Sequence, residues 1–264
     1  MDEVAGSRTF TASGDAYDSF MGRYSIALAP LLADLGGVVE GQRVVDVGCG
    51  PGALTAELVL RLGAGAVVAC DPSPAFLAAC RERHPGVDVR QGRAEALPLG
   101  DDAFDAALAQ LVLHFVSDAE TAALELRRVV RPSGRVAVCV WDFEGGMQML
   151  RAFWDAAVSL DPDAPDELHT MRFGRAGELS ALLAGAGFTD VSEHPLTVRS
   201  DYTDFEELWT SLLLGIGPAG AHLVALPPQE QERLRAAYLH LLGSPAGGFA
   251  LTAVARAAVG TVPA

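Results

Sequence analysis

A carboxylate stands just ahead of a glycine-rich turn early in the chain. The run Val44-Val45-Asp46-Val47 is followed by Gly48-Cys49-Gly50-Pro51-Gly52 and then by an apolar-periodic stretch. This order predicts a buried strand, a tight turn and a helix. Glycine reaches positive φ at low cost and lets a ligand approach the backbone, and the free N–H groups of the helix point at the turn. The turn therefore suits a nucleotide-like or amino-acid-like ligand.

The glycine spacing fits two kinds of cofactor. With Ala53 as a small third residue it fits the dinucleotide-binding turn, and Asp71 ends the next predicted strand about twenty residues later. Asp46 separates the two possibilities, because a diphosphate would meet its negative charge whereas a cationic ligand would be attracted. The sequence favours a cationic cofactor, and an NAD-dependent oxidoreductase is the alternative.

The segment 44–52 resembles the first motif of class I S-adenosylmethionine-dependent methyltransferases, of the small-molecule type found in ubiquinone and menaquinone biosynthesis. The resemblance implies that Asp46 and the backbone at Gly48 hold the methionine ammonium, and that Asp71 binds both ribose hydroxyls. S-adenosylmethionine carries a sulfonium and an ammonium but no phosphate, which suits a turn with a carboxylate and no lysine. We expect the cofactor to contact Asp46, Gly48, Cys49, Gly50, Asp71, Pro72, Ser73, Arg93, Ala94, Glu95, Gln110, Leu111, Tyr17 and Arg23.

The second family signature is altered in this chain. Arg93 stands where the family has an acid that accepts from the adenine amino group, and a guanidinium cannot accept a hydrogen bond. Either Arg93 flanks the adenine, or a carbonyl or Glu95 takes the amino group. Ala94 is expected to contribute its backbone N–H.

The methyl acceptor is expected beyond the end of the fourth strand, 105–109. Gln110 should lie under the methionine part, with His114 at the mouth of the crevice. His114 is the candidate general base, because its ordinary pKa near 6.5 suits proton abstraction at neutral pH; the alternative is a packed or orienting histidine. The residues expected in the substrate pocket are Met21, Tyr24, Phe115, Trp141 and Trp209.

Strands and helices alternate regularly up to a fifth strand, 135–141, which predicts a parallel α/β sheet with right-handed crossovers. The resemblance implies a Rossmann-like, seven-stranded, mostly parallel sheet in the order 3-2-1-4-5-7-6. The last two strands are expected within 187–198 and 248–259, separated by two helical patterns joined at 215–220. We expect an N-terminal helical arm (1–39), helical over 15–35, a methyltransferase domain (40–203 and 245–264) and a helical lid insert (204–244).

Composition narrows the partners. The 264 residues include 34 acidic and 19 basic ones, for a formal net charge of −15, and 50% are hydrophobic. Such acidity disfavours nucleic acid and anionic membranes. Cys49, Cys70, Cys80 and Cys139 have no metal-binding or redox spacing and are expected to be small buried residues of a reducing compartment. With neither a leader nor a long apolar run, we expect a cytoplasmic monomer or homodimer.

These observations predict in-line methyl transfer to a small, partly apolar metabolite, with S-adenosylhomocysteine as product. Positioning and desolvation can supply much of the acceleration, because the methyl donor is already activated. The sequence shows no cluster with metal-ligand spacing, so no metal is expected. Besides an NAD-dependent oxidoreductase, the alternatives are a cofactor-binding protein without catalysis and a macromolecular methyltransferase, which would need a basic or extended docking surface.

Overall fold

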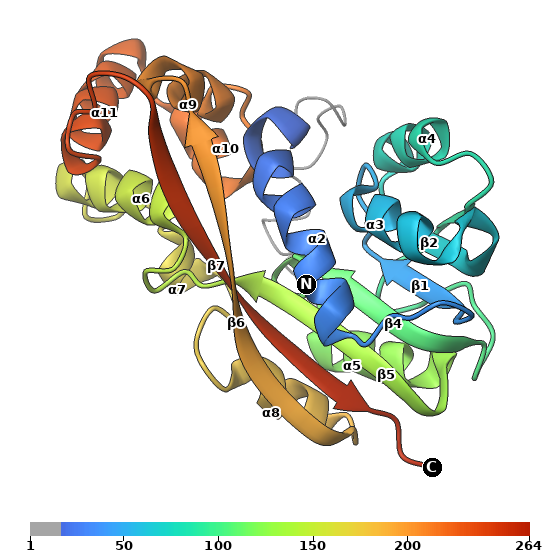
Figure 1. Cartoon of the computed structure of the whole chain (residues 1–264). Helices are drawn as coiled ribbons and strands as arrows, with labels where there is room; N and C mark the ends of the chain where they lie inside the picture. Colours follow the sequence, from blue (N-terminus) through green and yellow to red (C-terminus); the bar gives the residue numbers. More distant parts are fainter. Residues whose placement is uncertain (1–16) are drawn as a thin grey trace.

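The computed structural model describes residues 17–264, and in it seven strands form one sheet (Figure 1). The strand order is β3-β2-β1-β4-β5-β7-β6, which confirms the predicted order. β7 runs antiparallel to both of its neighbours, β5 and β6, while the β1–β5 pairs are parallel. The strands are β1 (Val44–Val47), β2 (Val67–Asp71), β3 (Asp88–Gln91), β4 (Phe104–Gln110), β5 (Val130–Trp141), β6 (Thr189–Tyr202) and β7 (Phe249–Thr261).

Helices cover both faces of the sheet, which explains why its central strands are almost wholly apolar. One face carries α2 (Arg23–Leu35), α3 (Ala53–Leu62) and α4 (Pro74–Arg83), and the other carries α5 (Ala119–Val129) and α8 (Glu178–Gly185) (Figure 1). Alternate residues of one strand enter different cores: Val44 packs on the first face and Val45 on the second. The carboxyl ends of β1, β2 and β4 are left to form a crevice.

The described part of the N-terminal arm begins at Tyr17. A short π-helix, η2 (Asp18–Gly22), continues directly into α2. The predicted helix over 15–35 is thus present from residue 17 on, and its first two positions lie outside the described residues. Phe20, Met21 and Tyr24 are buried, so this arm packs as part of the core.

The chain after β5 forms the second half of the molecule. Its helices before β6 are α6 (Gln148–Leu160), α7 (Glu167–Thr170) and α8. Between β6 and β7 lie α9 (Phe205–Leu212), α10 (Gly217–Ala225) and α11 (Pro228–Leu241). The prediction of two helices joined at 215–220 is wrong, because α10 starts inside that joint. Pro218 sits in its first turn, where a missing N–H costs nothing.

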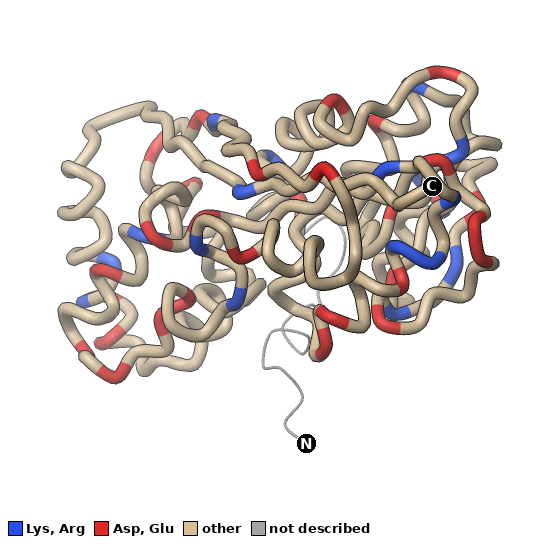
Figure 2. The backbone as a smooth tube through the Cα atoms, turned by 90° about the horizontal axis from the view of Figure 1, so that it is seen from below, with Lys and Arg blue, Asp and Glu red and all other residues tan. Residues whose placement is uncertain are grey.

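The insert of α9, α10 and α11 packs against α6. The ring of Phe153 meets Tyr238 edge-on, with 5.8 Å between centroids, and His222 lies 5.4 Å from Trp154. Acidic and basic residues are interspersed along the molecule (Figure 2). Within residues 17–264, no single helix is long and apolar enough to cross a membrane; the bent pair α9 and α10 meets that test only in combination.

Candidate active site

The glycine-rich turn after β1 adopts a backbone that side chains would obstruct. Gly48, Gly50 and Gly52 have φ of +73°, +54° and +105°. A Cβ on Gly48 would lie 2.3 Å from Cγ2 of Val112. The N–H groups of Gly48 and Cys49 both donate to the Cys70 carbonyl, at 2.7 and 3.0 Å, so the turn is tied to the end of β2.

A cavity of about 400 Å³ lies at the carboxyl ends of β1, β2 and β4, and we call it the cofactor cavity. It contains most residues that the sequence predicts at the cofactor. The glycine turn contributes Gly48 and Gly50, and the end of β2 with the segment leading into α4 contributes Asp71, Pro72 and Ser73. The segments after β3 and β4 contribute Arg93, Ala94, Glu95, Gln110 and Leu111. Sequence reasoning did not anticipate Phe76, Val112 and Val116, which add apolar surface.

Asp71 is held at the end of β2 by two backbone donors. Its Oδ2 accepts from Gly50 N at 3.0 Å and its Oδ1 from Ser73 N at 2.8 Å. Burial raises the pKa of this carboxyl, and the two hydrogen bonds act in the opposite direction. The side chain joins the glycine turn to the start of α4 and lines the cofactor cavity, where ribose hydroxyls are expected.

A small cavity of about 30 Å³ behind the turn is lined by Ser25, Asp46, Cys49 and Gln110 among others. Asp46 is 1% exposed, and its Oδ2 accepts from Thr55 Oγ1 at 2.6 Å. Gln110 Nε2 donates to the Ser25 carbonyl at 2.9 Å, which orients the amide. Asp46 Oδ1, Gln110 Oε1 and Ser25 Oγ are buried without a hydrogen-bond partner among the described residues.

We call Ser25, Asp46 and Gln110 the cation cage. Burial raises the pKa of Asp46 to about 7, the Thr55 hydroxyl opposes this, and the nearby charge of Asp71 adds to it. An unpaired buried carboxylate is costly, and a bound cation with N–H donors would offset that cost. Three buried oxygens around a space this small match an ammonium group and exclude a phosphate.

The opposite end of the cofactor cavity has a polar rim. Arg93 is 56% exposed on its side chain, and its Nη2 lies 3.2 Å from Glu95 Oε1 and 3.0 Å from Ser117 Oγ. Glu95 Oε1 also accepts from Ser117 N at 3.0 Å. Burial would raise the pKa of Glu95, but backbone N–H groups and Arg93 outweigh it and lower the pKa. Arg93 and Glu95 were both proposed to lie at the adenine end, and both line the cofactor cavity. The Glu95 carboxylate is occupied by its pair with Arg93.

The two residues of the arm that the sequence predicts at the cofactor are placed differently. Tyr17 lines both the cofactor cavity and the small cavity around the cation cage. Its ring meets that of Phe76 edge-on, with 5.7 Å between centroids. Burial raises the pKa of its hydroxyl to about 12. Arg23 lies outside the cavity: it pairs with Glu207, and its guanidinium lies 4.3 Å over the ring of Tyr202.

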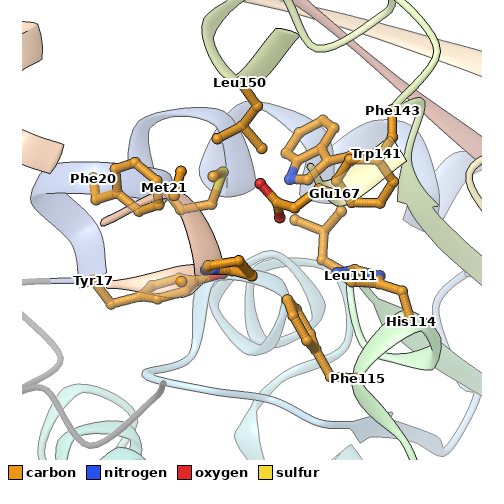
Figure 3. A pocket seen from close by; sticks show the side chains of 13 residues that line it. Tyr17, Phe20, Met21, Leu111, His114, Phe115, Trp141, Phe143, Leu150 and Glu167 are labelled. Carbon is orange, nitrogen blue, oxygen red and sulfur yellow. The ribbon is translucent and has the colours of Figure 1, made fainter. Parts of the chain in front are cut away.

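A second, smaller cavity of about 30 Å³ adjoins the first, and we call it the acceptor chamber (Figure 3). Tyr17, Leu111 and Phe115 line both cavities. The other apolar walls are Phe20, Met21, Trp141, Phe143 and Leu150, and α10 closes one side with residues 217–219. Leu111 has φ of +61°, a conformation that costs a non-glycine residue about 1 kcal/mol or more.

Two of the residues predicted in the substrate pocket do not line the chamber. Tyr24 lies behind Trp141, with 6.1 Å between ring centroids, and its hydroxyl is 3.1 Å from that of Tyr202. Trp209 stacks on Phe205 at 6.2 Å and belongs to the core of the insert. An aromatic residue at helical spacing does not reveal which side it faces, which is why these two expectations were misplaced.

His114 lines the chamber. Its ring is 3% exposed and lies 3.9 Å from that of Phe115 and 5.7 Å from that of Phe143. Nδ1 has no hydrogen-bond partner among the described residues. Burial lowers the pKa of His114 to about 3, so the imidazole is neutral at physiological pH.

Sequence reasoning missed one titratable residue of the chamber, Glu167. It is the first residue of the four-residue α7 and is 3% exposed. Its Oε2 accepts from Trp154 Nε1 at 2.7 Å. Burial raises the pKa of Glu167 to about 7. No motif marks this acid in the sequence, because only the packing of α6 and α7 brings it to the site.

Comparisons with known proteins identify the family. The family described as "Methyltransferase domain" matches residues 45–138. The malonyl-[acyl-carrier protein] O-methyltransferase of Halorhodospira halophila is 30% identical over 240 residues, which is 88% of this chain and 78% of the relative. The chain belongs to the class I S-adenosylmethionine-dependent methyltransferases. This confirms the resemblance seen in segment 44–52.

Other relatives share part of the chain or its fold. A demethylmenaquinone methyltransferase of Streptomyces avermitilis is 37% identical over 98 residues, 37% of this methyltransferase and 42% of the relative. A crystal structure of a methyltransferase from an antibiotic biosynthesis pathway of Anabaena variabilis has a TM-score of 0.63 at 20% identity, covering 89% of this chain and 97% of that one. The latter likeness establishes the fold alone.

The residues of this methyltransferase fit the cofactor of its family. The cation cage would suit the methionine ammonium, the Asp71 carboxyl in the cofactor cavity could accept hydrogen bonds from ribose hydroxyls, and Phe76, Val112 and Val116 offer apolar surface for a base. The cofactor cavity adjoins the small cavity around the cation cage, because Gly48, Gly50 and Gln110 line both. Within residues 17–264, no group of three or more His, Cys, Asp or Glu side chains is arranged to hold a metal ion.

Proposed function

We propose that this methyltransferase transfers the methyl group of S-adenosylmethionine to a small, partly apolar acceptor. The observation that carries the proposal is the cation cage, in which three buried oxygens lack partners beside the glycine turn. S-adenosylmethionine supplies a methyl group activated by a positively charged sulfur. Asp46, Gln110 and Ser25 would hold its ammonium, and Asp71 would bind its ribose.

The acceptor chamber supports the rest of the proposal. Its aromatic and aliphatic walls exclude water, and its position next to the cofactor cavity, across Leu111, would orient the acceptor for in-line attack. In this conformation the chamber has room for about two water molecules. Entry of an acceptor therefore requires one wall to move, and we assign that motion to α10 and to the arm at Phe20 and Met21.

Charge and one of the named relatives, the demethylmenaquinone methyltransferase, support a small acceptor. The 34 acidic residues against 19 basic ones disfavour an anionic macromolecule as the acceptor. As a separate part of the proposal, we infer a cytoplasmic protein that acts as a monomer or homodimer. Demethylmenaquinone, the substrate in the name of the Streptomyces relative, is itself a largely apolar molecule. Aromatic side chains lining the chamber match an acceptor of that chemical kind.

Calorimetric titration tests the proposal. Wild-type protein is expected to bind S-adenosylhomocysteine and to bind NAD weakly or not at all. Asp46→Asn should weaken S-adenosylhomocysteine binding by about 10- to 100-fold, because a charged hydrogen bond to the ammonium becomes a neutral one. Asp163→Asn, at an exposed aspartate outside both cavities, is the matched control and should bind as the wild type does.

Two outcomes would replace the proposal with one of its alternatives. Tight NAD binding without S-adenosylhomocysteine binding would indicate an oxidoreductase. Normal S-adenosylhomocysteine binding with no methylated product from a broad panel of small acceptors would indicate a cofactor-binding protein without catalysis.

A further inference from the structure

The acceptor chamber contains a carboxyl group that forms no ion pair with any of residues 17–264. Glu167 extends from the start of α7 into the chamber, and Figure 3 shows its carboxyl facing the space between Met21 and Trp141. Trp154 Nε1 donates to Oε2 at 2.7 Å. The carboxyl lines the chamber, where it can meet a ligand.

Among residues 17–264, the cation that acts on Glu167 is Arg151, and it is already paired. Arg151 binds both oxygens of Asp166 at 3.1 and 2.6 Å and reaches Asp155 at 2.8 Å. Glu167 therefore lies beside an ion pair whose charges largely cancel. Such a buried carboxyl is expensive to retain unless a partner binds it, which marks it as a functional group.

We propose that Glu167 binds the nucleophilic O–H or N–H of the methyl acceptor and takes its proton during transfer. The inference rests on the proposed function and deepens it by naming the acceptor class. That class is a compact, apolar, electrically neutral molecule with one protic nucleophile, such as a phenol or an uncharged amine.

The proton-transfer step balances without any further reactant. A lone pair on the acceptor oxygen or nitrogen forms the new bond to the methyl carbon, and the carbon–sulfur bond breaks with its electron pair remaining on sulfur. The O–H or N–H bond then gives its proton to Glu167 Oε1. The proton neutralises the carboxylate and the methylated acceptor leaves uncharged, so no net charge is left in the apolar chamber.

Glu167 is a stronger base than His114 in this environment. Burial raises the pKa of the carboxyl to about 7 and lowers the pKa of the imidazole to about 3. The carboxyl is therefore the stronger base of the two. A catalytic base is most effective when its pKa lies near the operating pH, which favours Glu167.

The charged and titratable neighbours of Glu167 are accounted for. The charge of Asp166 raises its pKa and that of Arg151 lowers it. Across the chamber, Tyr17 has a pKa raised to about 12 and His114 is neutral, so both are uncharged at pH 7. His222 of α10 packs on Trp154 rather than on the carboxyl, and its pKa is lowered by burial. A sulfonium next to the chamber would repel an ammonium, which favours a neutral acceptor.

Small probes test this assignment on the full chain in complex with S-adenosylhomocysteine. Phenol and aniline carry a protic nucleophile, whereas toluene has the same ring without one. Calorimetry with wild-type protein at pH 8 is expected to show phenol or aniline binding at least 10-fold more tightly than toluene. The preference for phenol should weaken at pH 6, where the carboxyl is protonated, and the stronger of phenol and aniline reports whether the nucleophile is oxygen or nitrogen.

Glu167→Gln separates recognition from folding. Its amide oxygen can still accept from Trp154 Nε1, and its N–H₂ group then faces the chamber in place of Oε1. We expect this variant to bind S-adenosylhomocysteine as the wild type does and to lose the preference for phenol and aniline over toluene. With whichever probe is methylated, kcat/KM should fall by about 10²- to 10⁴-fold, and its rise with pH near 7 should disappear. Glu232→Gln, at an exposed glutamate of α11, is the control.

The outcomes separate a failure of the role proposed for Glu167 from a failure of the proposed methyltransferase function. A wild type that binds S-adenosylhomocysteine but takes toluene as tightly as phenol and aniline overturns the role of Glu167 and leaves the proposed function standing. The same holds if the pH dependence near 7 survives in Glu167→Gln and is lost in His114→Asn, since His114 would then be the base. A wild type that binds no S-adenosylhomocysteine overturns both.

Discussion

Burial determines what each titratable side chain of the site can do. Asp46 and Glu167 are both acids whose pKa is raised to about 7, yet the surroundings of each favour a different partner. Asp46 shares its cavity with two other unpaired oxygens and suits a cation, whereas Glu167 lies among aromatic rings and suits a single donor. The same burial leaves His114 neutral. Desolvation is thus the largest influence on the pKa of all three groups, and it leaves two acids and one imidazole with distinct uses.

Gly48 is predicted to tolerate no side chain. Gly48→Ala should reduce the free energy of unfolding by about 3 kcal/mol, because positive φ is strained for alanine and its Cβ would overlap Val112. Gly243→Ala is the matched control: it also has positive φ, at +79°, but no atom lies within 4 Å of its added Cβ, so about 1 kcal/mol is expected. Urea unfolding measures both, and equal losses would show that the contact with Val112 is unimportant.

Residues whose role depends on chain order were predictable, and those brought in by packing were not. Asp46, Asp71 and Gln110 each stand at a recognisable point of a strand end, where the crevice of a parallel sheet must lie. Glu167 comes from a four-residue helix whose position depends on Trp154 and the rest of α6. The positive φ of Leu111 has no sequence signal, because leucine is not a residue that favours it.

At the scale of elements, η2 and α4 meet at the edge of the cofactor cavity. Asp18 of η2 lies 2.6 Å from Arg83 of α4, and Tyr17 packs against Phe76 beside it. Both Tyr17 and Phe76 line the cavity. The contact joins the arm to the nucleotide-binding half of the sheet, so it is placed to slow the release of a bound cofactor.

Asp18→Asn should speed cofactor release without unfolding the protein. The pair is partly exposed, with side-chain exposures of 30% and 32%, so the free energy of unfolding should change by less than about 1 kcal/mol. The dissociation rate of S-adenosylhomocysteine, measured by stopped flow, should rise about 3-fold. Asp34→Asn breaks a pair with Arg61 on α3 and should leave that rate unchanged. An equal change in the two variants would contradict the proposed role of the η2–α4 contact.

The elements themselves were largely predictable, with informative exceptions. The parallel half of the sheet follows from short apolar runs that alternate with amphipathic stretches. β5 is assigned from Val130, but its regular pairing with β4 and β7 begins at Arg135, as expected, and residues 131–134 form an irregular segment with Ser133 at φ +64°. α10 was missed because glycine and proline dominate its first turn. Local composition misleads where tertiary contacts hold an unfavourable sequence in regular structure.

At the scale of the whole molecule, the acidic balance gives stability two opposing dependences on pH. Ion-paired acids such as Glu207, whose hydrogen bond to Arg23 lowers its pKa to about 2, contribute stability that is lost as the pH falls. Asp46 and Glu167, whose pKa values are raised by burial, act in the other direction. The folded state holds their protons up to about pH 7, while the unfolded chain releases them near pH 4, so their contribution declines as the pH rises between these values.

Glu167→Gln isolates one part of that decline, because every other titration is common to the two proteins. Near pH 5 the wild-type carboxyl is protonated when folded, and the variant should have nearly the same free energy of unfolding. As the pH rises to 8, only the wild type loses the stability that the protonated Glu167 carboxyl contributes. The free energy of unfolding of the variant should then exceed that of the wild type by up to about 3 kcal/mol. Urea unfolding at pH 5, 6, 7 and 8 measures the difference. A difference that stays constant with pH would mean that Glu167 ionises in the folded protein as it does in water. Its pKa would then not be raised, contrary to the burial of its carboxyl in the acceptor chamber.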